Sequence, residues 1–542
     1  MCKSLRGLNR DCSTHQTQLV GDLKGPVTTH RKLGNMSVIE KLNEEVQHQG
    51  EIITDAPGSC GVDEEQAVLF RQFSAASSDW HREITKRLTK KVDLRLLPML
   101  MLMYMLNFLD RSNLSQARLG TLEYDLGMTG TDFNLATSIL FVGYILMQLP
   151  SNLLITRVSP SVYLGVVMTI WGAISAAQAA TRTFASLVIC RFFLGFAEAP
   201  FFPGAIFLMS SWYTRPELAL RIAWFYCGHS VANAFGGLLG AGALGNLNGA
   251  HGIAGWRWLF IIEGSITVFS AICSAFILPN YPATTKWLSP EERAYAQWRL
   301  IKDAGEVDVA DASSIKEGVM LALRDPRLYL FTLLQHASLL SQTFQYFFPT
   351  ILQTLGYGNI ETLLLTVPVW VVCFLVSLVV TYTSGRFADR SIHIICLVLI
   401  SVAGNIIVVA TLNNAARFFA LFLLPMGAVP AYQILLAWVA NSFPRPLVKR
   451  SACISFANMI GNSANIYGTY MYPSVDGPRY LAGGSATAAD ALLVAVLAII
   501  ARLVLQRQNR KLAIREASES DELQAQPGSP TTTTPVGFRY ML

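Results

Sequence analysis

The sequence predicts an all-α membrane protein in which twelve transmembrane helices form two pseudo-symmetric six-helix bundles. Three observations indicate this fold: charged residues are scarce, apolar runs long enough to cross a bilayer are numerous, and the two halves of the chain share short motifs. Of the 542 residues, 52% are hydrophobic and 14% are charged, and the mean hydropathy is +0.39. A soluble protein carries about 25% charged residues, so this chain is poorly suited to water.

The charged residues are concentrated in three segments. Residues 1–95 hold 27 of them, residues 281–327 hold 15, and residues 506–542 hold 9. The rest of the chain, roughly 363 residues, holds only 27. Because so few charges cannot cover a globular surface, the solvent of this part must be lipid. The pattern argues against an ordinary cytosolic enzyme, a secreted disulfide scaffold and a nucleic-acid-binding protein.

Apolar runs of about 20 residues, the length that crosses a bilayer, occur twelve times. They cover residues 94–115, 134–155, 161–181, 185–211, 221–246, 257–279, 328–352, 362–384, 392–412, 416–441, 449–472 and 484–505. We therefore expect five regions. These are a mostly disordered N-terminal tail over 1–92, a six-helix bundle over 93–280, a central loop over 281–327, a second six-helix bundle over 328–505, and a disordered C-terminal tail over 506–542.

The central loop is polar but contains signals for short amphipathic helices. Its SPEE sequence, residues 289–292, has Ser at the N-cap, Pro at the first helical position and Glu at the third. This is the pattern of a capping box, which predicts that a helix begins there.

Basic residues indicate the orientation in the membrane. An even number of spans places both ends on one side, and cytoplasmic loops are enriched in Lys and Arg. With both ends in the cytoplasm, the inner loops and flanks hold sixteen basic residues and the outer loops hold five. We therefore expect both termini to be cytoplasmic and the membrane to be the plasma membrane. The N-terminal MCKSLRGLNRDCST has no apolar core and does not resemble a secretory signal.

Short motifs recur in the two halves in the same order. SNLLITR at residues 151–157 and SGRFADR at residues 384–390 each follow the second span of their half. At a constant offset of 229, three residues of the first half recur in the second: Arg221 as Arg450, Ala223 as Ala452, and Asn233 as Asn462. These matches predict two homologous bundles, with a substrate site at their interface near the middle of the membrane.

The second copy of this loop carries Gly385, Asp389 and Arg390, and it resembles the GxxxDR loop of the major facilitator superfamily. The glycine would allow close approach, and the Asp-Arg pair would act as a conformational latch between neighbouring helix ends. The first copy has Asn152 and Thr156 at the corresponding Gly and Asp positions, which puts a latch in the first half in doubt.

A charge at the centre of a membrane costs about 2.5–3.5 kcal/mol on insertion scales, and four charged residues of the predicted spans stand out. Asp110 and Arg111 are late in the first span, and Arg191 and Glu198 are in the fourth. Seven residues are nearly two helical turns, so Arg191 and Glu198 share a face about 10 Å apart. The four could merely pair and join two helices, but buried ion pairs seldom add net stability. We expect them to line a water-filled cavity. Glu263 follows Arg257 near the outer surface and is expected to pair locally.

Uncharged polar residues recur at helical spacing in other spans. They are Asn107 in the first span, Tyr144, Gln148 and Asn152 in the second, His229 and Asn233 in the fifth, Gln335, Ser338, Gln342 and Gln345 in the seventh, and Ser451, Ser455, Asn458, Asn462 and Asn465 in the eleventh. Any one of them could instead form a hydrogen bond between helices. Together they favour a polar cavity that is ionisable on its N-terminal side and neutral on the other.

Several segments resemble one family in order along the chain. NFLDRSN, GYILMQLPSN, RFFLGFAEAPFFPG, SWYTRPELALR and GWRWLFIIEG are similar to segments of the anion:cation symporter family, in particular its fungal allantoate-permease branch. That branch includes carriers of nicotinate, pantothenate, biotin and allantoate. The resemblance is strong from about residue 93 to residue 300 and weaker beyond. It implies proton coupling and anion binding at Asp110, Arg111, Arg191 and Glu198.

Our hypothesis from the sequence is proton-coupled symport of a small organic anion, such as a vitamin or a nitrogen-rich acid, by alternating access. Asp110 and Glu198 would carry protons, and Arg191, followed by Arg111, would bind the anion, because an Arg offers a planar fork to a carboxylate. The remaining substrate contacts would come from Asn107, His229, Asn233, Gln342, Asn458 and Asn462. We expect a monomer in the lipid bilayer without cofactor or metal, and no nucleic-acid partner.

Three other functions are weighed against this one. An exporter of an acidic or drug-like secondary metabolite would typically carry a GP-containing glycine motif on the fifth span, which here reads NAFGGLLGAGALG without proline. An enzyme is disfavoured, since the sequence has no HExxH and no nucleophile elbow. A non-transporting nutrient receptor would share this sequence, and only a flux measurement would separate it from a carrier.

Overall fold

The computed structural model describes residues 64–155, 158–308, 315–387, 389–443, 447–525 and 540–541. The described residues form helices and no strands, as predicted. The chain divides into two compact units, residues 1–67 and 68–542. Of the first unit only residues 64–67 are described, at the start of α2 (Glu64–Ala75), and everything below concerns the second unit.

The first half contains the helices of the N-terminal bundle. They are α3 (Ser78–Ala117), α4 (Leu122–Asp125), α5 (Asp132–Ile155), α6 (Pro160–Ala177), η1 (Gln178–Ala180), α7 (Phe184–Glu198), α8 (Phe201–Ser210), α9 (Arg215–Asn246), η2 (Ala250–Gly252) and α10 (Gly255–Ile277). Local signals start several of them. Pro160 occupies the first turn of α6, where its missing N–H would have no helical partner. At α7, Thr183 forms a capping box with Ser186, which gives partners to free N–H groups of the first turn.

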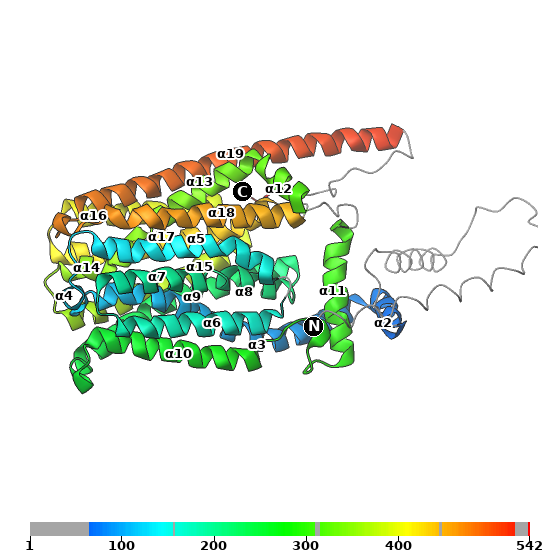
Figure 1. Ribbon diagram of the computed structural model, residues 1–542. Coiled ribbons are helices and arrows are strands. Elements are labelled where there is room, and N and C mark those ends of the chain that lie inside the picture. Colours follow the sequence, from blue (N-terminus) through cyan, green and yellow to red (C-terminus); the bar gives the residue numbers. More distant parts are fainter. Residues whose placement is uncertain are drawn as a thin grey trace, which may run out of the picture. The chain divides into compact units, whose positions relative to one another are not determined.

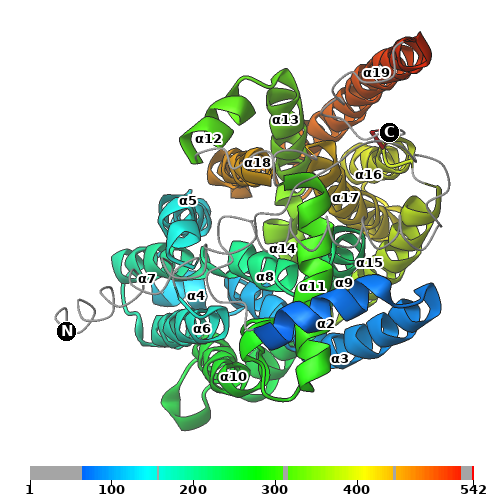
Figure 2. The ribbon, with the colours of Figure 1, turned by 90° about the vertical axis from the view of Figure 1, so that its right-hand side faces the viewer.

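The central segment consists of η3 (Pro282–Thr284), α11 (Pro290–Asp308) and α12 (Ile315–Leu323). The predicted capping box is confirmed: the N–H of Glu292 donates to Ser289 Oγ at 3.1 Å, and the N–H of Ser289 donates to Glu292 Oε2 at 3.2 Å. Helix α11 lies across one end of the long helices (Figures 1 and 2). We call this the α11 end and the opposite one, where α4 lies, the α4 end.

The second half contains the helices of the C-terminal bundle. They are α13 (Pro326–Leu340), η4 (Thr343–Phe347), α14 (Phe348–Gln353), α15 (Asn359–Phe387), α16 (Ser391–Ala410), α17 (Asn414–Ser442), α18 (Leu447–Gly468), η5 (Thr469–Met471), η6 (Ser474–Asp476) and α19 (Leu481–Ala525). The seventh predicted span is broken into α13, η4 and α14, and the tight η4 turn places Gln342 and Gln345 beside the bundle interface.

Helical structure extends further at both ends than the sequence predicts. The expected disordered tail over 1–92 overlaps α2 and the first part of α3, and the tail over 506–542 overlaps the end of α19. The extension of α3 has partners: Lys91 pairs with Glu292 of α11 at 2.5 Å, and the His81 ring stacks on Trp298. Contacts with α11, which sequence periodicity does not reveal, therefore order residues that are too polar to be part of a span.

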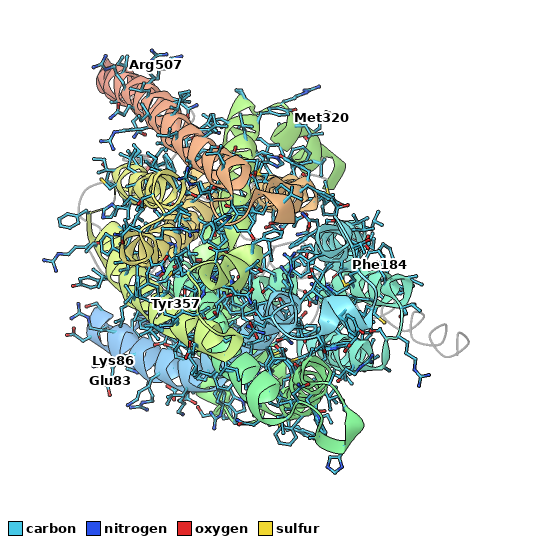
Figure 3. All side chains as sticks on the ribbon, turned by 90° about the vertical axis from the view of Figure 1, so that its left-hand side faces the viewer. Glu83, Lys86, Phe184, Met320, Tyr357 and Arg507 are labelled. Atoms are coloured by element: carbon cyan, nitrogen blue, oxygen red, sulfur yellow. The ribbon has the colours of Figure 1, made fainter. Side chains whose placement is uncertain are left out.

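The outward faces of the helices are suited to lipid. Eight helices of the described chain are long and apolar enough to cross a membrane. Large apolar side chains remain exposed on them, including Phe269, Phe276, Val379 and Phe419. By contrast, the exposed charged residues Glu83, Lys86 and Arg507 lie at the periphery, on the extensions of α3 and α19 (Figure 3). A surface without charge along the spans is stable in hydrocarbon.

Two groups of helices are seen end-on in Figure 2, one for each half of the chain. Within the first half, α3 packs on α9 and α10, α5 on α7, and α6 on α10; within the second, α16 packs on α17 and α19, and α13 on α18. The halves meet where α9 packs on α15 and α5 on α18. The sequence repeats relate α5 to α15 and α9 to α18, so the two contacts, α9 on α15 and α5 on α18, are equivalent to each other under the duplication.

Hydrogen bonds join the halves near both ends. Towards the α4 end, Asn134 Nδ2 donates to Thr469 O at 2.7 Å, and Asn359 Nδ2 donates to Leu119 O at 2.6 Å. Towards the α11 end, Gln433 Nε2 donates to Ala223 O at 2.7 Å. The cavity described next lies between these contacts.

Candidate functional site

A cavity of about 530 Å³ lies between the two halves. Both halves contribute to its wall, as expected for a site at a repeat interface. The lining residues are Tyr104, Asn107, Phe108, Arg111, Phe141, Tyr144, Phe202, Tyr226 and His229 from the first half, and Leu339, Gln342, Gln345, Tyr346, Tyr432, Asn458, Asn462 and Asn465 from the second.

Arg111 is the charged residue of the cavity wall. Its Nε donates to Glu198 Oε2 at 2.8 Å, and the Glu198 side chain is fully buried behind it. The guanidinium carbon lies 4.9 Å from the Tyr144 ring centre and 5.2 Å from that of Phe108, so aromatic faces stabilise the cation. Because Glu198 binds only Nε, the terminal nitrogens of Arg111 are free of Glu198 and remain available to a ligand.

Asp110 and Arg191 lie deeper in the first bundle and are not in the cavity wall. Arg191 Nη1 donates to the backbone oxygen of Asp110 at 3.2 Å, and its Nε donates to Ala136 O at 3.3 Å. The Asp110 carboxylate accepts from the hydroxyl of Ser175 on α6. Arg191 therefore joins α3, α5 and α7 through main-chain carbonyls.

The ionic partner of Glu198 comes from another helix. The seven-residue spacing placed Arg191 and Glu198 on one face of α7, and in the structure Arg111 of α3 pairs with Glu198. Arg111 lines the cavity and Arg191 does not. Arg191 has turned away because backbone carbonyls of the neighbouring helices accept its hydrogen bonds.

Most of the uncharged residues of the predicted site line the cavity. Asn107, His229, Gln342, Asn458 and Asn462 line it, whereas Asn233 does not. Asn233 lies behind His229, and its Nδ2 donates to the His229 backbone oxygen at 2.9 Å. His229 Nε2 lies 3.0 Å from Oε1 of Gln345 in the other half. The histidine thus connects the two bundles at the cavity.

The predicted latch residues lie at the α11 end of the second half, between α15 and α16. Asp389 forms an ion pair with Arg502 of α19 at 2.7 Å. Burial alone would raise the pKa of Asp389, but hydrogen bonds from Arg502, the Ile392 N–H and Ser391 lower it below its ordinary value. Arg390 is buried, and a Cβ added to Gly385 would meet nothing within 4 Å. The side chains of Asn152 and Thr156 lie outside those that the structure describes.

Glu263 does not pair with Arg257, contrary to the sequence expectation. Arg257 donates instead to the backbone oxygens of Ala179 and Thr181. The Glu263 side chain is fully buried, and neither of its oxygens has a hydrogen-bond partner among the described residues. Six residues turn a helix through about 600°, which places Arg257 and Glu263 on different faces.

The aromatic wall of the cavity is the main feature that the sequence analysis missed. Tyr104, Phe108, Phe141, Phe202, Tyr226, Tyr346 and Tyr432 all line it. A signal was present, because Tyr104, Asn107, Phe108 and Arg111 follow the spacing of one helix face. Among the described residues, no group of three or more His, Cys, Asp or Glu side chains could hold a metal ion.

Comparison with protein families gives a match to the model described as the Major Facilitator Superfamily, over residues 100–469. Among curated proteins, the MFS-type transporter cnsO of Penicillium expansum is 32% identical over 483 residues, which cover 86% of this chain and 91% of the relative. The major facilitator-type transporter hxnP of Emericella nidulans is 32% identical over 407 residues, which cover 74% of this chain and 81% of the relative.

Solved structures share the fold at low sequence identity. The proton:xylose symporter XylE has a TM-score of 0.59 and 14% identity, covering 76% of this chain and 95% of that one. A bacterial homologue of the human lysosomal transporter Spinster, inward-facing and unoccupied, has a TM-score of 0.56 and 15% identity, covering 75% of this chain and 94% of that one.

Proposed function

The chain belongs to the Major Facilitator Superfamily, and we propose that it is a proton-coupled symporter of a small organic anion. The observation that carries the proposal is the position of Arg111, which lines the cavity while only its Nε is paired with the buried Glu198. A planar guanidinium group with two nitrogens available suits a carboxylate.

Proton coupling follows from competition for Arg111. With Glu198 ionised, the arginine is held by its internal partner. Protonation of Glu198 removes that charge, so the whole guanidinium group becomes available to the anion. Since the proton and the anion each favour binding of the other, their binding is thermodynamically coupled. Glu198 is therefore the first proton carrier of our proposal, and Asp110 is the second.

The two arginines have different tasks in this proposal. Arg111 binds the anion, because it lines the cavity. Arg191 of α7 positions α3 and α5, because its hydrogen bonds go to main-chain oxygens of Asp110 and Ala136. Arg191 is thus a positioning residue in the conformation observed.

The uncharged polar residues of the cavity wall would contact the rest of the substrate. Gln342, Asn458 and Asn462 of the second half and Asn107 and His229 of the first would donate and accept hydrogen bonds. The surrounding Tyr and Phe rings favour a substrate with a flat unsaturated part, because ring faces stack well. This combination suggests an aromatic or heterocyclic carboxylic acid, with Asn233 supporting His229 from behind.

The proposal also covers the family branch, the oligomeric state, the membrane and the orientation of the protein. It would be a monomeric member of the allantoate-permease branch in the plasma membrane, with both termini in the cytoplasm. The excess of basic residues at the α11 end supports this orientation. Gly385, Asp389 and Arg390 would then be a cytoplasmic latch, which holds α15 and α16 to α19 during the cycle.

The test is uptake of radiolabelled carboxylic acids into proteoliposomes, with about pH 5.5 outside and about pH 7.5 inside. A difference of 2 pH units drives roughly 100-fold accumulation for each coupled proton. We expect wild type to concentrate at least one acid, and Glu198→Gln to lose the pH dependence. The matched control is Glu123→Gln, which changes a surface acid paired with Arg118 and should behave as wild type. Unchanged pH-driven uptake by Glu198→Gln would show that the proton assignment is wrong.

A second candidate function is export of an acidic secondary metabolite. The aromatic share of the cavity wall favours it, since such rings also bind bulky apolar compounds. The two functions differ in the direction of coupling. An exporter would empty loaded vesicles when the proton gradient is applied, whereas a symporter would fill them.

A further inference from the structure

Glu263 is a buried acid that the proposed mechanism does not use. Its side chain has no exposed surface, and both carboxyl oxygens lack a hydrogen-bond partner among the described residues. A carboxylate without a partner is costly in a low-dielectric interior. The residue therefore either holds a proton or depends on neighbouring charges.

The neighbouring charges are few and come from two other helices. Those that interact with Glu263 are Asp110 of α3 and Arg191 and Glu198 of α7. Helix α6 and the η1 turn both pack against α10, and they contribute the uncharged Trp171, Ser175 and Gln178. The charged residues of α9 lie in its first turns, at the α11 end.

Three of these groups lie at the same depth. Glu263 is eight residues from the start of α10, Asp110 is seven residues from the end of α3, and Arg191 is seven residues from the start of α7. At 1.5 Å per residue, all three are about 10–12 Å from the α4 end of their helices. Close packing of α6 on α10 holds this layer together, because a Cβ on Gly264 would come within 2.5 Å of the Ala176 nitrogen.

The buried charges of the first half do not balance. Among the described residues its spans bury three carboxyl groups, those of Asp110, Glu198 and Glu263, and two guanidinium groups, those of Arg111 and Arg191. If all five were ionised, one negative charge would remain in the membrane interior. Arg111 donates a hydrogen bond to Glu198, and the Ser175 hydroxyl donates one to the Asp110 carboxylate. Glu263 receives neither kind of hydrogen bond, so its negative charge is the least stabilised of the three.

We propose that Glu263 is a third proton-binding carboxyl group of the transport cycle, which holds a proton in this conformation and exchanges it with Asp110. In this step the O–H bond of Glu263 breaks and an O–H bond forms at Oδ2 of Asp110, an oxygen without a partner among the described residues. One proton moves and the total charge is unchanged. The negative charge shifts from α3 to α10, so Arg191 is attracted to a different helix.

This inference rests on the proposed function, but its first test does not require a substrate. Infrared spectroscopy of the purified full chain in liposomes at about pH 7.5 detects the C=O stretching band of a protonated carboxyl group. We expect this band in wild type and in the control Glu123→Gln, and its loss in Glu263→Gln. Glu263→Asp should retain a band at a shifted frequency, which controls for misfolding of the amide variant. An unaltered band in Glu263→Gln would overturn the proposal.

The second test uses the acid that wild type concentrates best in the uptake panel. For Glu263→Gln we expect accumulation under a gradient of about 2 pH units to fall by roughly 100-fold, the factor for one coupled proton. Exchange of labelled for unlabelled acid at equal pH should stay within about twofold of wild type, since the anion site at Arg111 is intact. Full accumulation in the variant would contradict the proposal. If wild type transports no acid of the panel, the proposed function fails while the infrared result still decides the state of Glu263.

Discussion

At the scale of residues, the two arginines of the first half illustrate how position decides role. Both are buried, but Arg111 faces the cavity and binds Glu198 through one nitrogen, while Arg191 donates to main-chain oxygens. A guanidinium group that holds helices together has few donors left for a ligand. The position in the wall, rather than the presence of charge, therefore identifies the anion-binding residue.

The first prediction separates these roles by Arg→Lys substitution. Lysine keeps the charge but loses the planar fork. We expect Arg111→Lys to raise the KM for the transported acid about tenfold or more, the loss of one bidentate interaction. Arg191→Lys should mainly lower the thermal stability of the purified protein, with a smaller effect on KM. Equal KM values in Arg111→Lys and wild type would contradict the assignment.

The sequence predicts which charged residues form the site better than it predicts which of them pair with each other. Asp110, Arg111, Arg191 and Glu198 stand out because charge is rare in apolar spans, and the structure buries all four in the first bundle. Their partners lie on other helices, and helical periodicity compares residues of one helix only. For this reason the Arg111–Glu198 pair could not be predicted, and Glu263 was assigned to Arg257.

At the scale of elements, glycines set the distance between α5 and α7. A Cβ on Gly195 would lie 1.9 Å from Leu140 O, and one on Gly143 would lie 2.2 Å from Phe192 O. Each glycine thus lies against the main chain of the other helix. Arg191 and Glu198 keep their place because α7 can approach α5 this closely.

The second prediction tests this contact. Gly195→Ala should lower the free energy of unfolding by about 1–3 kcal/mol, because the helices must separate. The control is Gly242→Ala in α9, where a Cβ would meet nothing within 4 Å and alanine should be neutral or stabilising by up to about 1 kcal/mol. Thermal unfolding in detergent measures both. Equal stability of the two variants would show that the close approach is not required.

A second element-scale feature is the start of α13, where Asp325 caps the helix and pairs with Arg327 and Lys449. Partial burial would raise the pKa of Asp325, but the hydrogen bonds and charges of Arg327 and Lys449 lower it to about 2. A carboxyl group whose pKa is lower in the folded state stabilises the fold above its ordinary value of 3.8. That contribution is lost as the pH falls through the folded value.

The third prediction follows from the lowered pKa of Asp325. Asp325→Asn keeps the cap but removes the charge, and should cost about 1–2 kcal/mol near neutral pH, allowing for screening by solvent. The difference from wild type should fall to roughly half near pH 3. Asp79→Asn, at an exposed position, serves as the control with little effect at either pH. A difference that is the same at both pH values would exclude an ionic contribution.

Elements were predicted well where apolar pattern alone decides them. Eight helices of the described chain have the length and hydropathy of a span, and the capping box of α11 is present, because length, hydropathy and Ser289–Glu292 spacing are local properties. The break between α13 and α14 and the extension of α3 depend on partners elsewhere, such as Glu292 for Lys91. Such tertiary contacts leave no periodic signal in the sequence.

At the scale of the whole molecule, the duplication explains where the cavity lies. The duplication relates α5 to α15 and α9 to α18, and the halves meet through two equivalent contacts, α9 on α15 and α5 on α18. The cavity lies between the hydrogen bonds that join the halves near the two ends. The first half supplies its charge and the second most of its amides. A bound anion therefore touches both halves at once, which allows binding to influence their relative arrangement.

In the proposed cycle a proton on Glu198 and an anion on Arg111 bind together. The number of protons taken up from a weakly buffered solution, when the transported acid binds the purified protein near pH 7.5, tests this coupling. We expect uptake of about one proton per bound acid by wild type and by Glu123→Gln, and none by Glu198→Gln. Equal proton uptake by wild type and Glu198→Gln, or binding by wild type without any proton uptake, would contradict it.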